Sequence, residues 1–243
     1  MYLRDAWYVA ATSDEISQSP LARLLLEEPV VLWRMSDGTA VAFEDRCCHR
    51  HAPLSAGRVL GDNLQCGYHG LTFDRSGTCV DVPSQARVPP DARIRAYPLV
   101  ERYNWVWIWM GDPVAANEAL IPETYWHESA DWCAVGDKFL VDCHYQSLID
   151  IQLDNTHSRF VHPDTLGNDG SLRHDPKTTR DGETLRNHRR MPDSDPPPIF
   201  ARAAKIDGNA DVWVEWQYTP RAGIITFDAG VAELGSGVFD GDR

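Results

Sequence analysis

The sequence has no long uninterrupted apolar run. A helix that crosses a bilayer needs about 18–20 consecutive apolar residues, and no stretch of this 243-residue chain approaches that length. The first residues, MYLRDAWYVAATSDEI, carry charges where a secretory signal peptide would have its apolar segment. We therefore expect a cytoplasmic protein.

Positive charge is also scarce. Lysine and arginine total 23 against 36 aspartates and glutamates, which gives a formal net charge of −13. A face that binds nucleic acid neutralises phosphates with lysine and arginine, so this composition argues against nucleic-acid binding. There is no internal repeat, and 43% hydrophobic residues over 243 positions are enough for two domains with buried cores.

The chain is predicted to be an α+β protein with two domains, residues 1–112 and 113–243. The first domain is expected to be all β, because short apolar runs alternate with turn sequences such as Ser36-Asp37-Gly38. A last apolar strand, WVWIWM, closes with Gly111-Asp112-Pro113. This turn is the expected end of the first domain.

The second domain is predicted to combine a helix with an antiparallel sheet. Apolar side chains spaced through residues 142–162 favour a partly buried helix, which Pro163 ends. Residues 212–218 and 223–234 alternate as two neighbouring strands would. Residues 164–198 are polar and end in three prolines, which favours a long loop or lid with little core of its own.

The six cysteines are few, and two of them belong to a pattern with histidines. In a reducing compartment, cysteines are thiols or metal ligands more often than disulfides. Cys47, His49, Cys66 and His69 form the pattern C-x-H-x16-C-x2-H. Each pair lies in an expected turn, where neighbouring side chains converge and glycines allow close approach of the backbone. Two loops are therefore predicted to hold one metal centre.

The ligand types alone leave two metal centres open. Two thiolates and two imidazoles suit tetrahedral zinc. They equally suit a 2Fe–2S cluster in which the cysteines bind one iron and the histidines bind the other.

The flanking residues favour the cluster. The segment CCHRHAPLSAGRVLGDNLQCGYHGLTF closely resembles the Rieske domain of ring-hydroxylating and O-demethylating oxygenases. The resemblance implies that Cys47 and His49 are the first ligand pair and that Cys66 and His69 are the second. Cys48 and His51 are then neighbours of the cluster and not ligands. Such a cluster has a potential of about −150 to +300 mV, against about −400 mV in plant-type ferredoxins, and suits an intermediate electron carrier.

A second pattern, D-x2-H-x4-H, is formed by Asp154, His157 and His162. On a regular helix the two histidines point about 140° apart. Both reach one metal only if the helix ends or bulges between them, which Pro163 or a bulge near residues 158–161 would allow.

Rieske oxygenases carry a similar pattern after the cluster domain. The resemblance implies that His157 and His162, with a later carboxylate, form the facial triad of a mononuclear Fe(II) site with positions open to oxygen. It also implies that Asp154 bonds a cluster histidine of the adjacent subunit in a homotrimer and couples the two metals. Ile151 departs from the family's O-demethylase branch, which often has asparagine there, and Asp150 remains a structural candidate.

The later carboxylate has no clear source in this sequence. In the resembling family it comes from a helix well over a hundred residues beyond the histidine pair, whereas 81 residues follow His162 and end in GSGVFDGDR, which has no helical periodicity. We therefore expect the chain to be part of a longer oxygenase. The remaining candidates lie on expected strands or in the Gly- and Asp-rich tail: Asp228, Glu233, Asp240 and Asp242.

The resemblance covers essentially the whole chain and is nearest to vanillate O-demethylase and related aromatic acid monooxygenases. It implies an enzyme that O-demethylates or hydroxylates an aromatic acid, with electrons from a separate NAD(P)H-dependent reductase or ferredoxin component. Two alternatives remain: an electron carrier whose second domain no longer catalyses, and a zinc-binding interaction module.

Overall fold

The computed structural model describes residues 2–154 and 156–239 of the chain. The chain forms two compact units, Met1–Gly136 and Asp137–Arg243, and each has its own hydrophobic core. Among the described residues, no helix is both long and apolar enough to cross a membrane.

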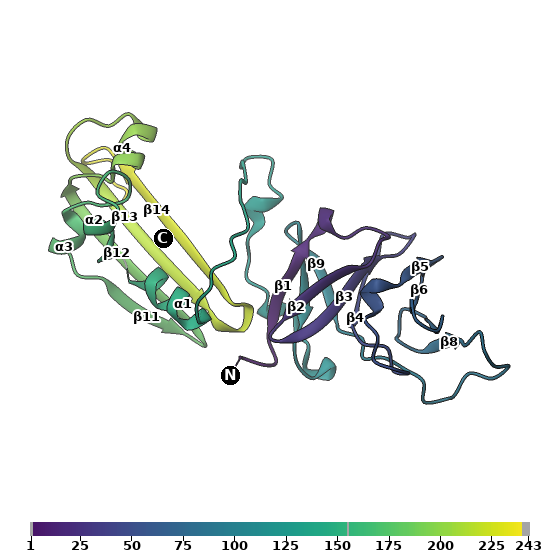
Figure 1. The fold of residues 1–243 in the computed structure, drawn as a ribbon. Helices are drawn as coiled ribbons and strands as arrows, with labels where there is room; N and C mark the ends of the chain where they lie inside the picture. The colour runs from purple at the N-terminus through teal and green to yellow at the C-terminus, as the bar shows by residue number, and fades with distance from the viewer. Residues whose placement is uncertain (1, 155, 240–243) are drawn as a thin grey trace. The chain divides into compact units, whose positions relative to one another are not determined.

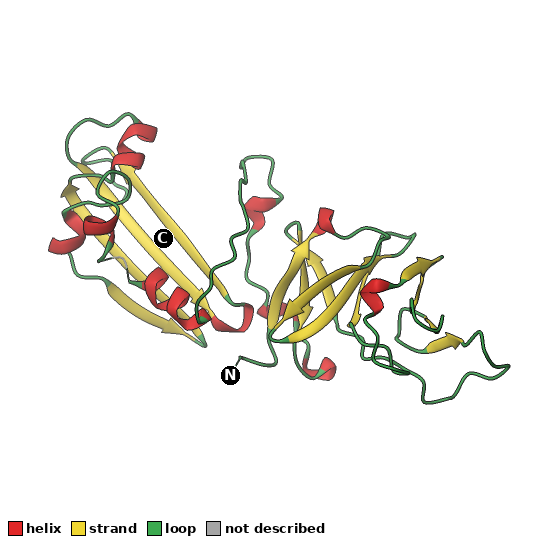
Figure 2. Ribbon diagram, in the orientation of Figure 1, coloured by secondary structure: helices red, strands yellow, loops and turns green. Residues whose placement is uncertain are grey.

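The first unit contains three small antiparallel sheets (Figures 1 and 2). Their strand orders are β1-β10-β9, β2-β3-β4 and β5-β6-β7-β8. The strands are β1 (Trp7–Thr12), β2 (Leu21–Leu25), β3 (Glu28–Arg34), β4 (Ala40–Glu44), β5 (Arg58–Leu60), β6 (Asn63–Gln65), β7 (Thr72–Phe73), β8 (Cys79–Asp81), β9 (Leu99–Arg102) and β10 (Trp105–Trp109). The short 3-10 helices are η1 (Ser13–Glu15), η2 (Leu54–Ala56), η3 (Pro113–Ala115), η4 (Glu118–Leu120) and η5 (Tyr125–His127). The predicted all-β first domain is confirmed.

Strand β3 explains why this unit has continuous apolar runs. Its residues 30–33 are completely buried, and they point alternately into two cores. Val31 and Trp33 pack in the core that also holds Cys47 and Cys66, whereas Leu32 packs in the core beneath β1 and β10. A strand that is buried on both faces needs apolar side chains at every position.

The second unit is one antiparallel sheet with short helices (Figure 2). Its strand order is β11-β12-β13-β14. The strands are β11 (Lys177–Asp181), β12 (Thr184–Ser194), β13 (Ala210–Thr219) and β14 (Ile224–Ala232). The helices are α1 (Tyr145–Leu153), α2 (Ser158–Val161), α3 (Gly170–Arg173), α4 (Pro198–Ala204) and the 3-10 turn η6 (Pro220–Ala222). The prediction that residues 212–218 and 223–234 form neighbouring strands is confirmed, because β13 pairs with β14.

The predicted lid over residues 164–198 is wrong. This segment contains helix α3 and strands β11 and β12, and Met191 on β12 is completely buried in the core of the second unit. The strand β12 cannot be recognised from its sequence, TLRNHRRMPDS, because polar and charged side chains occupy both of its faces. The apolar alternation that identifies a half-buried strand is therefore missing.

The helix predicted for residues 142–162 is split and less buried than expected. It ends at Leu153, and a separate single turn, α2, follows after His157. Leu148, Phe160 and Val161 are exposed, while Leu153 packs against the core of the sheet.

Candidate metal centres and substrate cavity

The loops that carry the two Cys/His pairs have the same backbone hydrogen bonds. The N–H of Cys47 donates to the carbonyl of Ala52 (2.9 Å), and the N–H of Cys66 donates to that of Leu71 (2.8 Å). The residue four positions after each cysteine donates back to the cysteine carbonyl, at 2.9 Å and 3.1 Å. Those residues, His51 and Gly70, both have a left-handed backbone, with φ of +57° and +77°. His51 is thus part of the turn, in agreement with its predicted role as a neighbour.

The two loops pack closely on each other. A Cβ on Gly67 would lie 2.7 Å from the carbonyl oxygen of Ala56, and a Cβ on Gly57 would lie 2.1 Å from that of Gln65. The approach is therefore possible only with glycine at both positions. Asp45 closes the first loop, since its carboxylate accepts from the N–H (2.7 Å) and the hydroxyl (2.5 Å) of Ser55.

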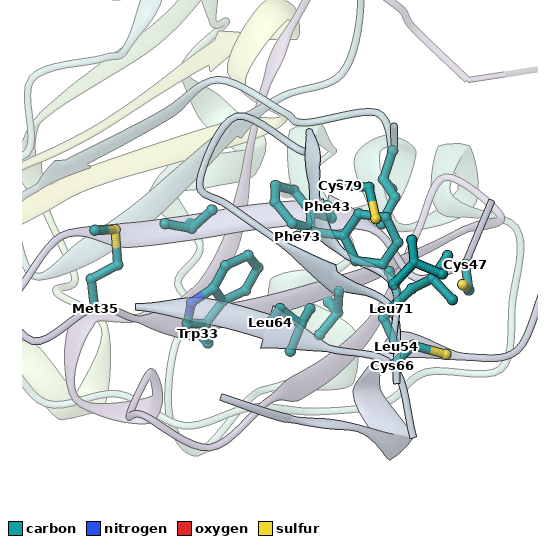
Figure 3. Packing of buried hydrophobic residues seen from close by; sticks show 14 residues of the cluster. Trp33, Met35, Phe43, Cys47, Leu54, Leu64, Cys66, Leu71, Phe73 and Cys79 are labelled. Atoms are coloured by element: carbon teal, nitrogen blue, oxygen red, sulfur yellow. The ribbon is translucent and has the colours of Figure 1, made fainter. Parts of the chain in front are cut away.

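The four candidate ligand side chains are arranged by residue type, with the two cysteines buried and the two histidines exposed. Cys47 and Cys66 are buried at one end of the core near Leu54 and Leu71 (Figure 3), and the Cys66 thiol is close enough to contribute to the raised pKa of Cys47. His49 and His69 are exposed, and their ring centroids are 4.6 Å apart. The thiols thus pair with each other inside, and the imidazoles pair with each other outside.

This arrangement fits a Rieske cluster. A cluster with two thiolates on one iron and two imidazoles on the other needs ligands paired by type, whereas a single zinc ion needs all four around one point. In the described part of the chain, no three His, Cys, Asp or Glu side chains are placed to hold one metal ion. Burial, together with the Cys66 thiol, raises the pKa of Cys47 to about 11. The charge of bound iron would therefore be needed to hold this thiol as a thiolate.

The second predicted pattern lies at the break between α1 and α2. Asp154 caps α1 in an extended conformation, His157 begins the single turn of α2, and His162 leaves it with φ −126° and ψ 48°. Helix α1 thus ends before both histidines, which flank the single turn of α2, and their ring centroids are 5.6 Å apart. The Nδ1 atom of His157 is buried and has no hydrogen-bond partner among the described residues. A pair of imidazoles with an unpartnered buried nitrogen fits a metal site.

A cavity of about 350 Å³ surrounds these histidines. It lies between α1, α2, α4 and the sheet face that carries Met191, Val214 and Trp216. Its lining residues are Ile151, Gln152, Asp154, His157, Ser158, His162, Leu166, Asn168, Ser171, Met191, Pro197, Phe200, Val214, Trp216 and Phe227. The volume and the mixture of apolar walls with a few polar groups suit a small aromatic molecule.

Several residues that line the cavity were not predicted to do so, because they belong to the segment interpreted as a lid. Asn168, Ser171 and Met191 lie there. An apolar Met191 in the otherwise polar sequence of β12 was the signal that one face of this strand could be buried. Ile151, which departs from the family pattern, lines the cavity, so the departure falls where a substrate would bind.

Asp154 is an ionised carboxylate at the rim of this site. Hydrogen bonds from the hydroxyl (2.6 Å) and the N–H (2.9 Å) of Thr156 hold the pKa of Asp154 below its usual value. The carboxylate therefore remains an acceptor at neutral pH.

The candidates for the later carboxylate do not join the two histidines. Asp228 accepts a hydrogen bond from Trp213 (2.9 Å), and neither Asp228 nor Glu233 lines the cavity. Asp240 and Asp242 lie outside the described residues.

Comparisons with known proteins agree with both halves of this description. Residues 6–98 match the Rieske [2Fe-2S] domain, and residues 141–239 match the vanillate O-demethylase oxygenase C-terminal domain. The chain is 42% identical over 247 residues to the toluene-4-sulfonate monooxygenase system iron-sulfur subunit TsaM1 of Comamonas testosteroni, covering all of this chain and 71% of that protein. It is 36% identical to a vanillate O-demethylase oxygenase subunit of a Pseudomonas species, covering 99% of this chain and 69% of that protein.

The chain belongs to the Rieske non-haem iron oxygenases. It is similar to the crystal structure of dicamba monooxygenase bound to dicamba, with a TM-score of 0.87 and 33% identity over 96% of this chain and 68% of that one. Another structure of dicamba monooxygenase contains non-haem iron with dicamba. The cofactors of this Rieske oxygenase are accordingly a 2Fe–2S cluster and a mononuclear iron. The comparisons support an oxygenase component that works with a reductase over the alternative of a non-catalytic electron carrier.

Proposed function

We propose that this protein is the oxygenase component of an aromatic acid monooxygenase, and that it O-demethylates or hydroxylates a substrate such as vanillate. The observation that carries the proposal is the cavity that brings His157 and His162 together with Trp216 and Phe227. Its apolar walls accept an aromatic ring, and its histidines lie where a metal would meet the ring's substituent.

We assign the metal ligands residue by residue. Cys47 and Cys66 would hold one iron of the cluster, and His49 and His69 would hold the other. His157 and His162 would hold the mononuclear iron. When bound, the cluster would supply electrons and the mononuclear iron would supply dioxygen activation. The corresponding functional domains are residues 1–112 and 113–243.

Residues of the chain shield the cavity from water and orient an imidazole. Trp216, Met191 and Phe200 exclude water from the inner part of the cavity, which favours a reaction that water would divert. Asp154, held ionised by Thr156, accepts a hydrogen bond and so fixes the orientation of an imidazole.

In the functional assembly we place Asp154 against an exposed cluster histidine of a second copy. Because this contact is head-to-tail, its closed form is a ring, and we propose a homotrimer. The reductase donates electrons from NAD(P)H, which places the system in the cytoplasm. Arg50 and Arg58 lie on the exposed first cluster loop and its following strand, and they offer local positive charge for docking to the reductase.

The proposal is tested by iron and sulfide analysis, EPR and turnover. Protein purified from iron-replete cells should contain equal amounts of cluster iron and labile sulfide, and its reduced form should give the spectrum of histidine-coordinated 2Fe–2S. His69→Ala should abolish that spectrum. With a reductase, NADH and vanillate or toluene-4-sulfonate, oxygen uptake should depend on the aromatic acid. Stoichiometric zinc without sulfide, or cluster reoxidation that no aromatic acid accelerates, would contradict the proposal.

A further inference from the structure

One buried amide reaches the cavity from the loop between α2 and α3. Asn168 is 3% exposed and lines the cavity together with His157 and His162. A polar side chain so deeply buried is normally hydrogen-bonded. The question is therefore which of its hydrogen-bonding atoms the protein uses.

The protein uses the oxygen of this amide. Oδ1 of Asn168 accepts from the backbone N–H of Ser171 (2.8 Å), and the Ser171 hydroxyl donates to the Asn168 carbonyl (2.9 Å). This pair of bonds fixes which way the amide faces, because only the oxygen can accept from an N–H. Neither of these two bonds uses the Nδ2 atom, which has two protons to donate and no hydrogen-bond acceptor among the described residues.

The loop that carries Asn168 is held against its neighbours on both sides. A Cβ on Gly167 would lie 2.8 Å from the carbonyl oxygen of Ser158, and one on Gly170 would lie 2.9 Å from the Ser194 Cβ. The N–H of Gly167 also donates to the carbonyl of His162 (2.9 Å). The position of Asn168 is thus tied directly to one of the two iron-binding histidines.

Charged groups fix the loop further. Asp169 forms an ion pair with Arg159 of α2, and its N–H donates to Asp195 (2.9 Å). A donor on a loop held by these contacts loses little conformational freedom when a ligand binds, so its hydrogen bond contributes to specificity more fully.

The other walls of the cavity define what this donor meets. Trp216 and Phe227 pack edge to face with ring centroids 5.5 Å apart, and Met191 lies on the neighbouring strand β12. Aromatic and thioether groups favour contact with a flat aromatic ring. A ring among these side chains would present its polar substituent to one of the few polar groups in the cavity.

We propose that Asn168 determines substrate specificity by donating a hydrogen bond from Nδ2 to an acidic oxygen, of a carboxylate or sulfonate, on the aromatic substrate. The inference rests on the proposed function and names the residue that recognises the acid. An ionised oxygen is the strongest acceptor such a substrate offers. Anchoring the acid beside His162 fixes which other substituent of the ring faces the iron-binding histidines.

Asn168→Asp tests the donor without removing the acceptor. Aspartate retains an oxygen for the N–H of Ser171 and has nearly the same size, but it replaces the Nδ2 donor with a charge that repels an oxyanion. Asn117→Asp is the matched control. Like Asn168, Asn117 accepts a hydrogen bond from a nearby backbone N–H through Oδ1, that of Ala119 (3.0 Å), and it does not line the cavity.

Binding of three probes to the iron-loaded protein is measured by calorimetry: vanillate, toluene-4-sulfonate and the neutral vanillyl alcohol. Loss of a hydrogen bond to a charged group lowers affinity by roughly 10- to 150-fold. We expect Asn168→Asp to weaken binding of at least one acid by that factor and to change vanillyl alcohol binding less than about threefold. Which acid is affected identifies the carboxylate or the sulfonate as the recognised group. Asn117→Asp should not change the affinity for any of the three probes.

In turnover, Asn168→Asp should raise KM for the acid more than it lowers kcat, and it should release less product per oxygen consumed. The EPR spectrum and melting temperature should match those of the wild type, which shows that the variant is folded. Unchanged acid affinity, an equal loss for vanillyl alcohol, or no binding of either acid to the wild type would overturn the role of Asn168. The proposed function is tested separately, by the cluster spectrum and by the dependence of the wild type's oxygen uptake on an aromatic acid, and a failure of Asn168 alone would leave both unchanged.

Discussion

Gly57→Ala should prevent assembly of the Rieske cluster although Gly57 binds no metal. The new Cβ would lie 2.1 Å from the carbonyl oxygen of Gln65 and 2.9 Å from that of Leu54. Both obstacles are backbone atoms, so no side chain can turn aside to make room. Gln65 directly precedes Cys66, and a shift of its carbonyl moves the second ligand loop away from the first.

The size of the effect follows from the overlap. Carbon and carbonyl oxygen need a separation of at least 3.0 Å, so one loop must move by about 1 Å. Overpacking of this kind costs about 1–3 kcal/mol, which is a large part of the stability of a small domain. Ligands must also be held within about 0.5 Å of their working positions. A displacement of this size therefore affects the metal centre more than the fold.

The assay compares cluster content with folding. Gly57→Ala should retain a cooperative melt at reduced temperature while losing most labile sulfide and most of the EPR signal of the reduced cluster. Gly136→Ala is the control, because a Cβ at Gly136 meets nothing within 4 Å. Full cluster content with an unchanged melting temperature in Gly57→Ala would refute the idea that close packing of the two loops aligns the ligands.

Three further predictions address the other groups. His157→Ala should lose the mononuclear iron and substrate-coupled oxygen uptake while keeping the cluster's EPR spectrum, as iron analysis with and without a chelator will show. Asp154→Asn should keep both metals but slow single-turnover electron transfer between them; an unchanged rate would remove its coupling role. Partial burial of Glu28 raises its pKa, but hydrogen bonds from Tyr97 and Arg4 outweigh this effect. The net result is a pKa below the usual value of 4.5. Its contribution to stability is present above pH 4.5 and is lost as the pH falls through the lowered pKa. The difference in melting temperature between wild type and Glu28→Gln should thus shrink as the solution is acidified below pH 4.5.

The candidate cluster ligands could be proposed from sequence because the geometry of each pair is local. Cys47 with His49 and Cys66 with His69 each lie in one tight turn, so spacing along the chain nearly fixes spacing in three dimensions. What spacing could not reveal is the packing between the turns. Gly57 lies outside both motifs, and its need for glycine arises only from the approach of Gln65 in the folded unit.

The second site was predictable only in part because its walls come from distant segments. An irregularity near the histidines was predicted, since two histidines five positions apart cannot share a side of a regular helix. The sequence placed it between His157 and His162, whereas helix α1 ends earlier, at Leu153. Strand β12 was missed, and with it Met191 and the loop of Asn168. On that strand Arg189 and Met191 are buried, while His188 is half-buried and Arg190 is exposed. Because a charged residue is among the buried ones, the order of polar and apolar residues does not show which face is buried.

The two metal sites differ in how fully the chain organises them. At the proposed cluster site, backbone hydrogen bonds hold both loops and the two thiols are buried, so that of the four proposed ligands only His49 and His69 face outward. A partner would therefore reach a bound cluster at its imidazole edge, and we expect electrons to enter or leave through these rings. At the proposed iron site, His157 and His162 flank the single turn of α2, whose exposed residues Phe160 and Val161 leave that turn with few contacts to hold it. Because a turn with few buried contacts opens more readily, iron at His157 and His162 should exchange faster than iron in the cluster.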